Sequence, residues 1–294
     1  MKKALHSVSY AGYWEGQKYL SLEEFILKAS KLGFDGVEIT SKRPHASVLD
    51  MNPKKVKEIK TLLERNNIEC AAIAGYTNFT GGYEGSEVPF REMQIEYVTK
   101  LAEIAHDLGG NLVRIFTGYE LLNVPYSRQW EWCVSSIKEC AKRAAEYGVT
   151  IGIQNHHDIA VNAMEMRDLL CEIDEPNCKA MFDAWAPALQ GDDLEEAVKT
   201  ISDLTVFTTV ADYVCHKRYN YNPNLINYER TSNIIKAVPM GEGFIDYKKF
   251  LNALKNSGYD GYVSYEMCSP VRGGGTEKNL DMYAMKFLEF MRQF

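Results

Sequence analysis

The sequence lacks the long apolar runs that characterise membrane-spanning and secreted proteins. No window comes near the roughly 20 consecutive apolar residues that a helix needs to cross a bilayer. The opening residues, MKKALHSVSY, contain two lysines, but no apolar stretch follows them, so we do not expect a signal peptide. These two absences predict a cytoplasmic protein without a membrane partner.

Paired-cysteine motifs and basic runs are also missing. The seven cysteines are scattered, odd in number and without C-x-x-C spacing, which is typical of reduced thiols in the cytosol. The formal net charge of −7 and the lack of a long basic run argue against a nucleic-acid partner. With 46% hydrophobic and 25% charged residues, the composition is that of an ordinary globular protein. Since the charge argues against a nucleic-acid partner, we expect a small molecule as the ligand.

No Pro-rich or Ser-rich linker divides the 294 residues. Short apolar runs alternate with amphipathic stretches of helical period, as in a parallel sheet built from βαβ units. Strands are expected near 3–9, 34–39, 68–74, 111–116, 149–154, 178–183, 204–210 and 259–266. Helices are expected to start at the capping box of Ser21 and Glu24 and at Asn52-Pro53, and to lie near 90–108, 127–147, 162–172, 192–202, 246–257 and 276–292.

Eight strand and helix units predict an α/β protein, a single (β/α)₈ TIM barrel over residues 1–294 with a long insertion after the seventh strand. The alternative is an open doubly wound sheet, but no G-x-G-x-x-G follows the first expected strand. In a barrel, the active residues lie at the carboxyl ends of the strands and in the loops that follow them. Those ends are therefore the place to look for chemistry.

The expected strand ends are polar. Their polar and aromatic residues are His6 with Trp14, Glu38 with Arg43 and His45, Arg114, Gln154 with His156 and His157, Asp183, Thr209 with Asp212, and Glu266. Since side chains alternate along a strand, Gln154, Asp183 and Glu266 are expected on the inner face. By the same alternation, His156 points to the barrel axis and His157 faces away. The simpler interpretation is that the histidines cap loop backbone groups and that the carboxylates form salt bridges with Arg114, Lys217 or Arg218.

Two further segments bear on the ligand. Residues 211–232 mix Lys217 and Arg218 with tyrosines, which suits a sugar ring or an anionic, polyhydroxylated ligand; the alternative is a surface lid. The stretch SPVRGGGTEKNLD places Arg272 and three glycines before a helix start at Thr276. This arrangement suits an anion, although a flexible connection also explains the glycines.

At these strand ends the sequence resembles the xylose isomerase-like TIM-barrel family of sugar isomerases and epimerases, which also contains endonuclease IV-type nucleases. The stretches that carry the resemblance are LGFDGVEIT, YGVTIGIQNH, KAMFDAW and the closing segment VPMGEGFIDYKKFLNALKNSGYDGYVSYE. The resemblance implies a divalent metal, often manganese, held by Glu, Asp, His and Glu on strands five to eight. It also implies that two of the acidic residues act as acid and base around a sugar's carbonyl group.

The match at the implied ligand positions is partial. Asp183 and Glu266 stand where the family has its ligands, but Gln154 replaces a Glu and Thr209 replaces a His. Ala186 fills the last position of the family's D-x-x-H spacing on strand six. We therefore expect a weakened site for Mn²⁺ or Mg²⁺ formed by Asp183, Glu266 and Gln154, since hard cations accept amide and water oxygens.

These features predict an enzyme that moves a proton next to the carbonyl of a keto-sugar, with His156, Glu266 and Gln154 in the catalytic positions. Substrate contacts are expected from His6, Trp14, Glu38, Arg43, His45, Arg114, His157, Lys217, Arg218 and Arg272. The alternatives are a keto-glycoside lyase or dehydratase of the same fold, a metal-free sugar-binding barrel and an endonuclease IV-like nuclease. The acidic charge and the small number of histidines, six in all, disfavour the nuclease. A homo-oligomer is compatible with the sequence.

Overall fold

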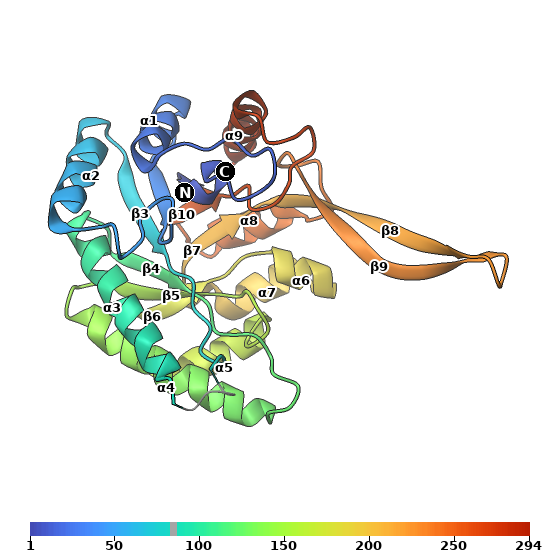
Figure 1. The fold of residues 1–294 in the computed structure, drawn as a ribbon, viewed down its shortest axis with the longest axis horizontal. Coiled ribbons are helices and arrows are strands. Elements are labelled where there is room, and N and C mark those ends of the chain that lie inside the picture. Colours follow the sequence, from blue (N-terminus) through green and yellow to red (C-terminus); the bar gives the residue numbers. More distant parts are fainter. Residues whose placement is uncertain (83–86) are drawn as a thin grey trace.

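The computed structural model describes residues 1–82 and 87–294. Within these ranges, eight parallel strands close into a barrel in the order β1-β10-β7-β6-β5-β4-β3-β2 (Figure 1). The strands are β1 (Lys2–His6), β2 (Gly36–Thr40), β3 (Glu69–Ala74), β4 (Leu112–Ile115), β5 (Thr150–Gln154), β6 (Cys178–Met181), β7 (Thr205–Val210) and β10 (Tyr262–Tyr265). Each lies where the alternation of apolar runs predicted a strand, so the expected (β/α)₈ barrel is confirmed.

Helices cover the outside of the barrel (Figure 1). They are α1 (Leu22–Leu32), α2 (Pro53–Arg65), α3 (Phe90–Asp107), α4 (Tyr126–Ala145), α5 (Ala163–Ile173), α6 (Trp185–Gln190), α7 (Leu194–Ile201), α8 (Tyr247–Asn256) and α9 (Glu277–Met291), with short 3₁₀ turns at Ser7–Tyr10 and Ser202–Leu204. The predicted helix starts are confirmed: Ser21 and Glu24 form a capping box, and the Asn52 side chain accepts the N–H of Lys55. No helix in the described ranges has the length and apolar character that crossing a membrane requires.

Two groups of apolar side chains hold the barrel together. The larger one lies between strands and helices and includes Ile26, Ile59, Val113, Ile151 and Phe287. The smaller one fills the inside of the barrel with Ala4, Ala71, Ala72, Leu112, Met181 and Phe207. Gly152 makes room for this filling, because a Cβ atom there would lie 2.8 Å from the Met181 Cγ. This packed interior separates the carboxyl end of the barrel, where active residues of the fold lie, from the end where the strands begin.

A long two-stranded ribbon follows β7. Its antiparallel strands, β8 (Asp212–Asn222) and β9 (Asn227–Val238), extend far from the barrel and end in an exposed tip (Figure 1). Asp212 fixes the base of the ribbon. Its carboxylate accepts hydrogen bonds from the backbone N–H groups of Tyr213, Gly241 and Gly243 at 2.8 to 2.9 Å. Gly243 must be glycine, since a Cβ would lie 1.9 Å from Asp212 Oδ1. This segment is therefore an extended ribbon and not a lid folded over the mouth of its own barrel.

Candidate functional site

A cavity of about 710 Å³ opens at the carboxyl ends of the strands. Seven of the residues predicted from the strand ends line it: His6, Trp14, Arg114, Gln154, His156, His157 and Glu266. Residues from the surrounding loops and helices complete its wall, among them Tyr13, Lys42, Tyr76, Asn78, Phe90, Gln94, Phe116, Tyr119, Trp185 and Cys268. Aromatic faces combined with a few polar groups are typical of a site for a small polar ligand.

The floor of the cavity contains a buried arginine. Arg114 Nε lies 3.7 Å from Glu38 Oε1, and His6 Nε2 lies 3.5 Å from the same oxygen. Burial raises the pKa of Glu38, which is inaccessible to solvent, and Arg114 partly opposes this increase. Burial and Arg114 together lower the pKa of His6, which is therefore neutral at pH 7. The structure places Glu38 beneath the cavity wall, where it contacts Arg114 and not a ligand, contrary to the expectation that it binds substrate.

Asp183 and Glu266 lie near this floor in different environments. Asp183 Oδ2 accepts the Gln154 Nε2–H at 2.8 Å, and Oδ1 accepts the N–H of Trp185 at 3.1 Å. Burial raises the pKa of Asp183 to about 6, although the hydrogen bond from Gln154 opposes this. Burial also raises the pKa of Glu266 to about 8, with the nearby carboxylates adding repulsion. At pH 7 Asp183 is mostly ionised and Glu266 is mostly protonated.

The donor set around these carboxylates fits a divalent cation poorly. Gln154 turns its N–H, not its oxygen, to Asp183, and Thr209 Oγ1 lies 3.5 Å from Glu38 Oε2. In residues 1–82 and 87–294 there is no group of three or more His, Cys, Asp and Glu side chains placed to hold a metal ion. Arg114 adds a positive charge that lowers the pKa of both Asp183 and Glu266. The expected metal site therefore receives no support from the side chains present.

His156 and His157 form a coupled pair on the cavity wall. His156 Nδ1 accepts the backbone N–H of His157 at 2.8 Å and lies 2.7 Å from His157 Nδ1. An acceptor nitrogen carries no proton, so neutral His156 is protonated on Nε2 and His157 on Nδ1. Burial lowers the pKa of each to about 4, so both are neutral at pH 7.

The prediction that His157 faces away from the cavity is wrong. Strand β5 ends at Gln154, and His157 adopts a left-handed backbone with φ of 67°. Its ring stacks on Phe116 and Tyr119, with centroids 4.4 and 4.1 Å away. Strand alternation therefore stops being a guide after Gln154, and both imidazoles line the cavity.

Sequence reasoning assigned no role to Lys42 or Trp185, which the fold brings to the same cavity. Lys42 Nζ lies 4.6 Å from the ring centroid of Tyr13 and 4.0 Å from that of Tyr76. Partial burial lowers the pKa of Lys42, and Arg114 adds to the decrease. Trp185 stacks on Tyr213 with centroids 5.0 Å apart. The only sequence signal was the position of Lys42 and Trp185 just beyond strand ends.

Besides Glu38, five predicted substrate contacts lie outside the cavity. Arg43 pairs with Asp50 at 2.7 Å on the surface, and Arg272 pairs with Glu242. Buried His45 bonds to Ser7 Oγ at 2.9 Å and the Leu20 carbonyl at 3.0 Å, so its ring supports loops beneath the mouth. Lys217 and Arg218 are exposed on the ribbon. The first three are therefore paired with nearby groups, and the last two lie on the exposed ribbon, so none of the five lines the cavity of its own barrel.

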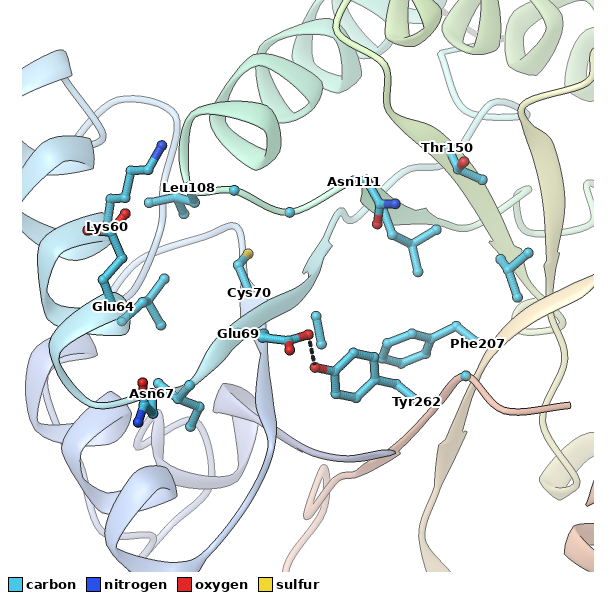
Figure 2. A pocket seen from close by; sticks show the side chains of 18 residues that line it. Lys60, Glu64, Asn67, Glu69, Cys70, Leu108, Asn111, Thr150, Phe207 and Tyr262 are labelled. Carbon is cyan, nitrogen blue, oxygen red and sulfur yellow. Dashed lines mark hydrogen bonds between the residues drawn. The ribbon is translucent and has the colours of Figure 1, made fainter. Parts of the chain in front are cut away.

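A second hollow, of about 980 Å³, lies at the opposite end of the barrel, where the strands begin (Figure 2). There the Tyr262 hydroxyl donates to Glu69 at 2.6 Å, the dashed bond in Figure 2, and Lys2 pairs with Glu69 at 2.8 Å. Burial raises the pKa of Cys70 to about 12, which leaves its thiol unreactive. Because this face of such a barrel serves stability and the carboxyl face serves chemistry, the mouth is the candidate active site.

The comparisons with known proteins agree with this geometry. The sequence profile of the xylose isomerase-like TIM barrel matches residues 26–292. The chain is 23% identical over 261 residues to the fructoselysine 3-epimerase of Escherichia coli O157:H7, covering 86% of this chain and 87% of that protein. It is 24% identical over 269 residues to the inosose dehydratase of Lacticaseibacillus casei, covering 85% and 83%.

Among solved structures, the D-psicose 3-epimerase with D-tagatose from Clostridium cellulolyticum H10 superposes with a TM-score of 0.74 at 22% identity, over 100% of this chain and 99% of that one. Homologues of this chain are thus sugar 3-epimerases and dehydratases. On the strength of the family profile, which spans most of the sequence, the chain belongs to the xylose isomerase-like TIM-barrel family.

Proposed function

We propose that this chain is an enzyme that moves a proton next to the carbonyl group of a keto-sugar or a related cyclic ketone. The homologues named above are a sugar 3-epimerase and an inosose dehydratase. Inversion of a carbon beside a carbonyl and loss of a β-hydroxyl can both start with removal of the proton on that carbon, because the carbonyl group accepts the electron pair. The aromatic rings of Trp14, Tyr76 and Trp185 in the cavity wall suit the C–H faces of a sugar ring.

The observation that carries the proposal is that Glu266, whose pKa is raised, and the neutral pair His156 and His157 line the same cavity. The pKa of Asp183 is raised to about 6 and that of Glu266 to about 8. A carboxylic acid that stays protonated at pH 7 is a proton donor, and a separate ionised or neutral base completes an acid and base pair. Glu266 lines the cavity and is therefore the proposed acid.

The histidine pair is the proposed base. Neutral His157 keeps its Nδ1 proton in the bond to His156, so its Nε2 is free to accept a proton. The base takes the proton on the carbon beside the carbonyl, and the electron pair of that C–H bond moves to the carbonyl oxygen. The carbonyl then re-forms as the electron pair returns from oxygen to carbon, and the Glu266 carboxyl donates its proton to the opposite face of that carbon, which inverts it. Alternatively, the returning pair forms a C=C bond to the β-carbon while the β C–O bond breaks, and Glu266 protonates the departing hydroxyl, which leaves as water.

The second outcome is a dehydratase, and the protonated state of Glu266 favours it as well, because a leaving hydroxyl needs an acid. Asp183 and Gln154 hold each other and shape the floor. No step of either reaction uses a metal, since the donor set fits one poorly.

All seven cysteines are free thiols, which supports the expectation of a reducing compartment such as the cytoplasm.

We also infer that the ribbon is a surface for self-association. It exposes Tyr219, Tyr221, Tyr228, Leu225 and Ile226, and a bare two-stranded ribbon is marginally stable in water. Residues 213–237 carry four Lys or Arg and one Glu, whereas the rest of the chain carries 29 Lys or Arg and 39 Asp or Glu. A basic ribbon on an acidic protein is complementary to a second copy of the same chain.

The test is turnover in D₂O followed by proton NMR, with ketohexoses, 3-keto-glucosides and inosose as substrates. We expect deuterium at the carbon beside the carbonyl of at least one ketone, together with either an epimer or a dehydrated product. Glu266→Gln should lower the rate by about 10² to 10⁴, whereas the matched exposed variant Glu58→Gln should not. Binding without exchange would indicate a silent sugar-binding barrel, and cleavage of abasic DNA without ketone turnover would indicate a nuclease.

A further inference from the structure

Arg114 is a buried cation in the wall of the cavity. It follows the inner face of β4, is only 2% exposed, and yet lines the cavity. Its guanidinium carbon lies 4.1 Å from the ring centroid of Phe116 and 4.9 Å from that of Tyr76. A guanidinium stays charged at all physiological pH values, so this is a fixed cation with a fixed plane.

The hydrogen-bonding capacity of this cation is largely unused. Among the described residues, Nε and Nη1 of Arg114 are buried without a hydrogen-bond partner. The third nitrogen, Nη2, lies 3.4 Å from His6 Nε2, and the nearest carboxylate oxygen, Glu38 Oε1, is 3.7 Å from Nε. A buried charged donor without an acceptor is costly. An anionic oxygen brought into the cavity would remove that cost.

Arg114 acts on every group to which the proposed reaction assigns a role. It lowers the pKa of His156 and His157 by repulsion, and it lowers the pKa of Asp183 and Glu266 by attraction. The geometry agrees, because Arg114, the two histidines and Glu266 all line the same cavity. A divalent cation between Asp183 and Glu266 would be repelled by it, in agreement with the poor donor set.

The following inference rests on the proposed function. We propose that the Arg114 guanidinium, in place of a divalent metal, binds the negative charge that forms on the substrate's carbonyl oxygen. When the neighbouring C–H bond breaks, its electron pair moves to that oxygen, and Arg114 donates hydrogen bonds without giving up a proton. Two N–H groups of a planar guanidinium match two oxygens of a planar enediolate. The substrate class is therefore an α-hydroxyketone.

Oxalate, a planar dianion with two neighbouring oxygens, is the probe. Titration calorimetry of the whole protein, dialysed against EDTA at pH 7, should show saturable binding of oxalate. Arg114→Gln should weaken oxalate binding about 100-fold. Arg114→Lys should weaken it about 10-fold, because lysine keeps the positive charge but lacks the two parallel N–H groups of the guanidinium. The matched control Arg65→Gln, exposed on α2, should bind oxalate as the wild type does.

Two measurements keep the test decisive if Arg114→Gln folds poorly. Oxalate should raise the melting temperature of the wild type in EDTA and should raise that of Arg114→Lys much less. Mn²⁺ titration followed by electron paramagnetic resonance should show no tight binding to the wild type or to Arg114→Lys, which both keep the positive charge; tight stoichiometric Mn²⁺ binding to the wild type would overturn the inference.

Oxalate binding that needs Mn²⁺, or that is equal in wild type and both Arg114 variants, would overturn the inference while leaving ketone turnover untouched. Arg114-dependent oxalate binding in a protein that turns over no ketone would refute the proposed function and leave the anion site standing.

Discussion

Replacing Glu266 by glutamine is expected to stabilise the protein in neutral and alkaline solution while removing its proposed acid. The carboxyl group has a pKa of about 8 in the folded protein, raised from its usual 4.5 by burial and by the neighbouring carboxylates Glu38 and Asp183. In the unfolded chain it returns to its usual value. Folding therefore favours the protonated form, and ionisation of Glu266 works against the folded state.

The size of the effect follows from the two pKa values. Each pKa unit corresponds to about 1.4 kcal/mol, so the wild type loses about 5 kcal/mol of unfolding free energy through this group as the pH rises from 4.5 to 8. Glutamine has the same shape and carries no charge. The buried amide N–H groups of glutamine need acceptors, which offsets part of this difference. We therefore expect the unfolding free energy of Glu266→Gln to exceed that of the wild type by about 2 to 5 kcal/mol at pH 9, or the melting temperature to rise by on the order of 5 °C.

Urea unfolding followed by tryptophan fluorescence at pH 5, 7 and 9 measures this difference. The advantage of Glu266→Gln should be small at pH 5, grow up to pH 8 and stay constant above it, and Glu58→Gln, exposed on α2, should show no such trend. A variant that is less stable than the wild type at pH 9 would refute the reasoning. That result would mean that a cation, such as a bound metal, pairs with the carboxylate and lowers its pKa.

Three further outcomes test the site and the assembly. Gln154→Glu with Thr209→His should tighten Mn²⁺ binding measured by titration, because a carboxylate and an imidazole replace neutral oxygens; unchanged affinity would show that these positions do not face a metal. His156→Ala and His157→Ala should each slow solvent-deuterium exchange by about 10² to 10⁴, and full exchange in both would assign the proton to another group. Sedimentation should give a dimer or larger species for the wild type and a monomer after residues 214–236 are replaced by a short glycine linker; a monomeric wild type would contradict the role of the ribbon.

The barrel could be predicted because its signals are local. The Ser21 capping box and the Asn52-Pro53 helix start depend on residues within one turn, and both are present. The strands follow from apolar runs bounded by turn residues. Since side chains alternate strictly within a strand, Gln154 and Asp183 could be assigned to the inner face, and Gly152 and Met181, two residues before them, lie inside the barrel.

Residues just beyond the strand ends could not be placed in the same way. His157 turns into the cavity because its backbone is left-handed, and Lys42 reaches it between the rings of Tyr13 and Tyr76. Arg43 follows directly after Lys42 but turns to Asp50 at the surface. Loop conformation depends on contacts with other loops, which are distant in sequence, so neighbouring residues can face opposite ways.

The sequence by itself determined the barrel, the face that carries the chemistry and the presence of two carboxyl groups there. Only the tertiary structure decided what those groups can do. Asp183 is held by Gln154, burial raises the pKa of Glu266, and Arg114 supplies a positive charge that acts on both carboxyl groups. The physical reason is that the strength of an electrostatic interaction depends on distance and on burial, and both are set by strands that lie far apart in the chain.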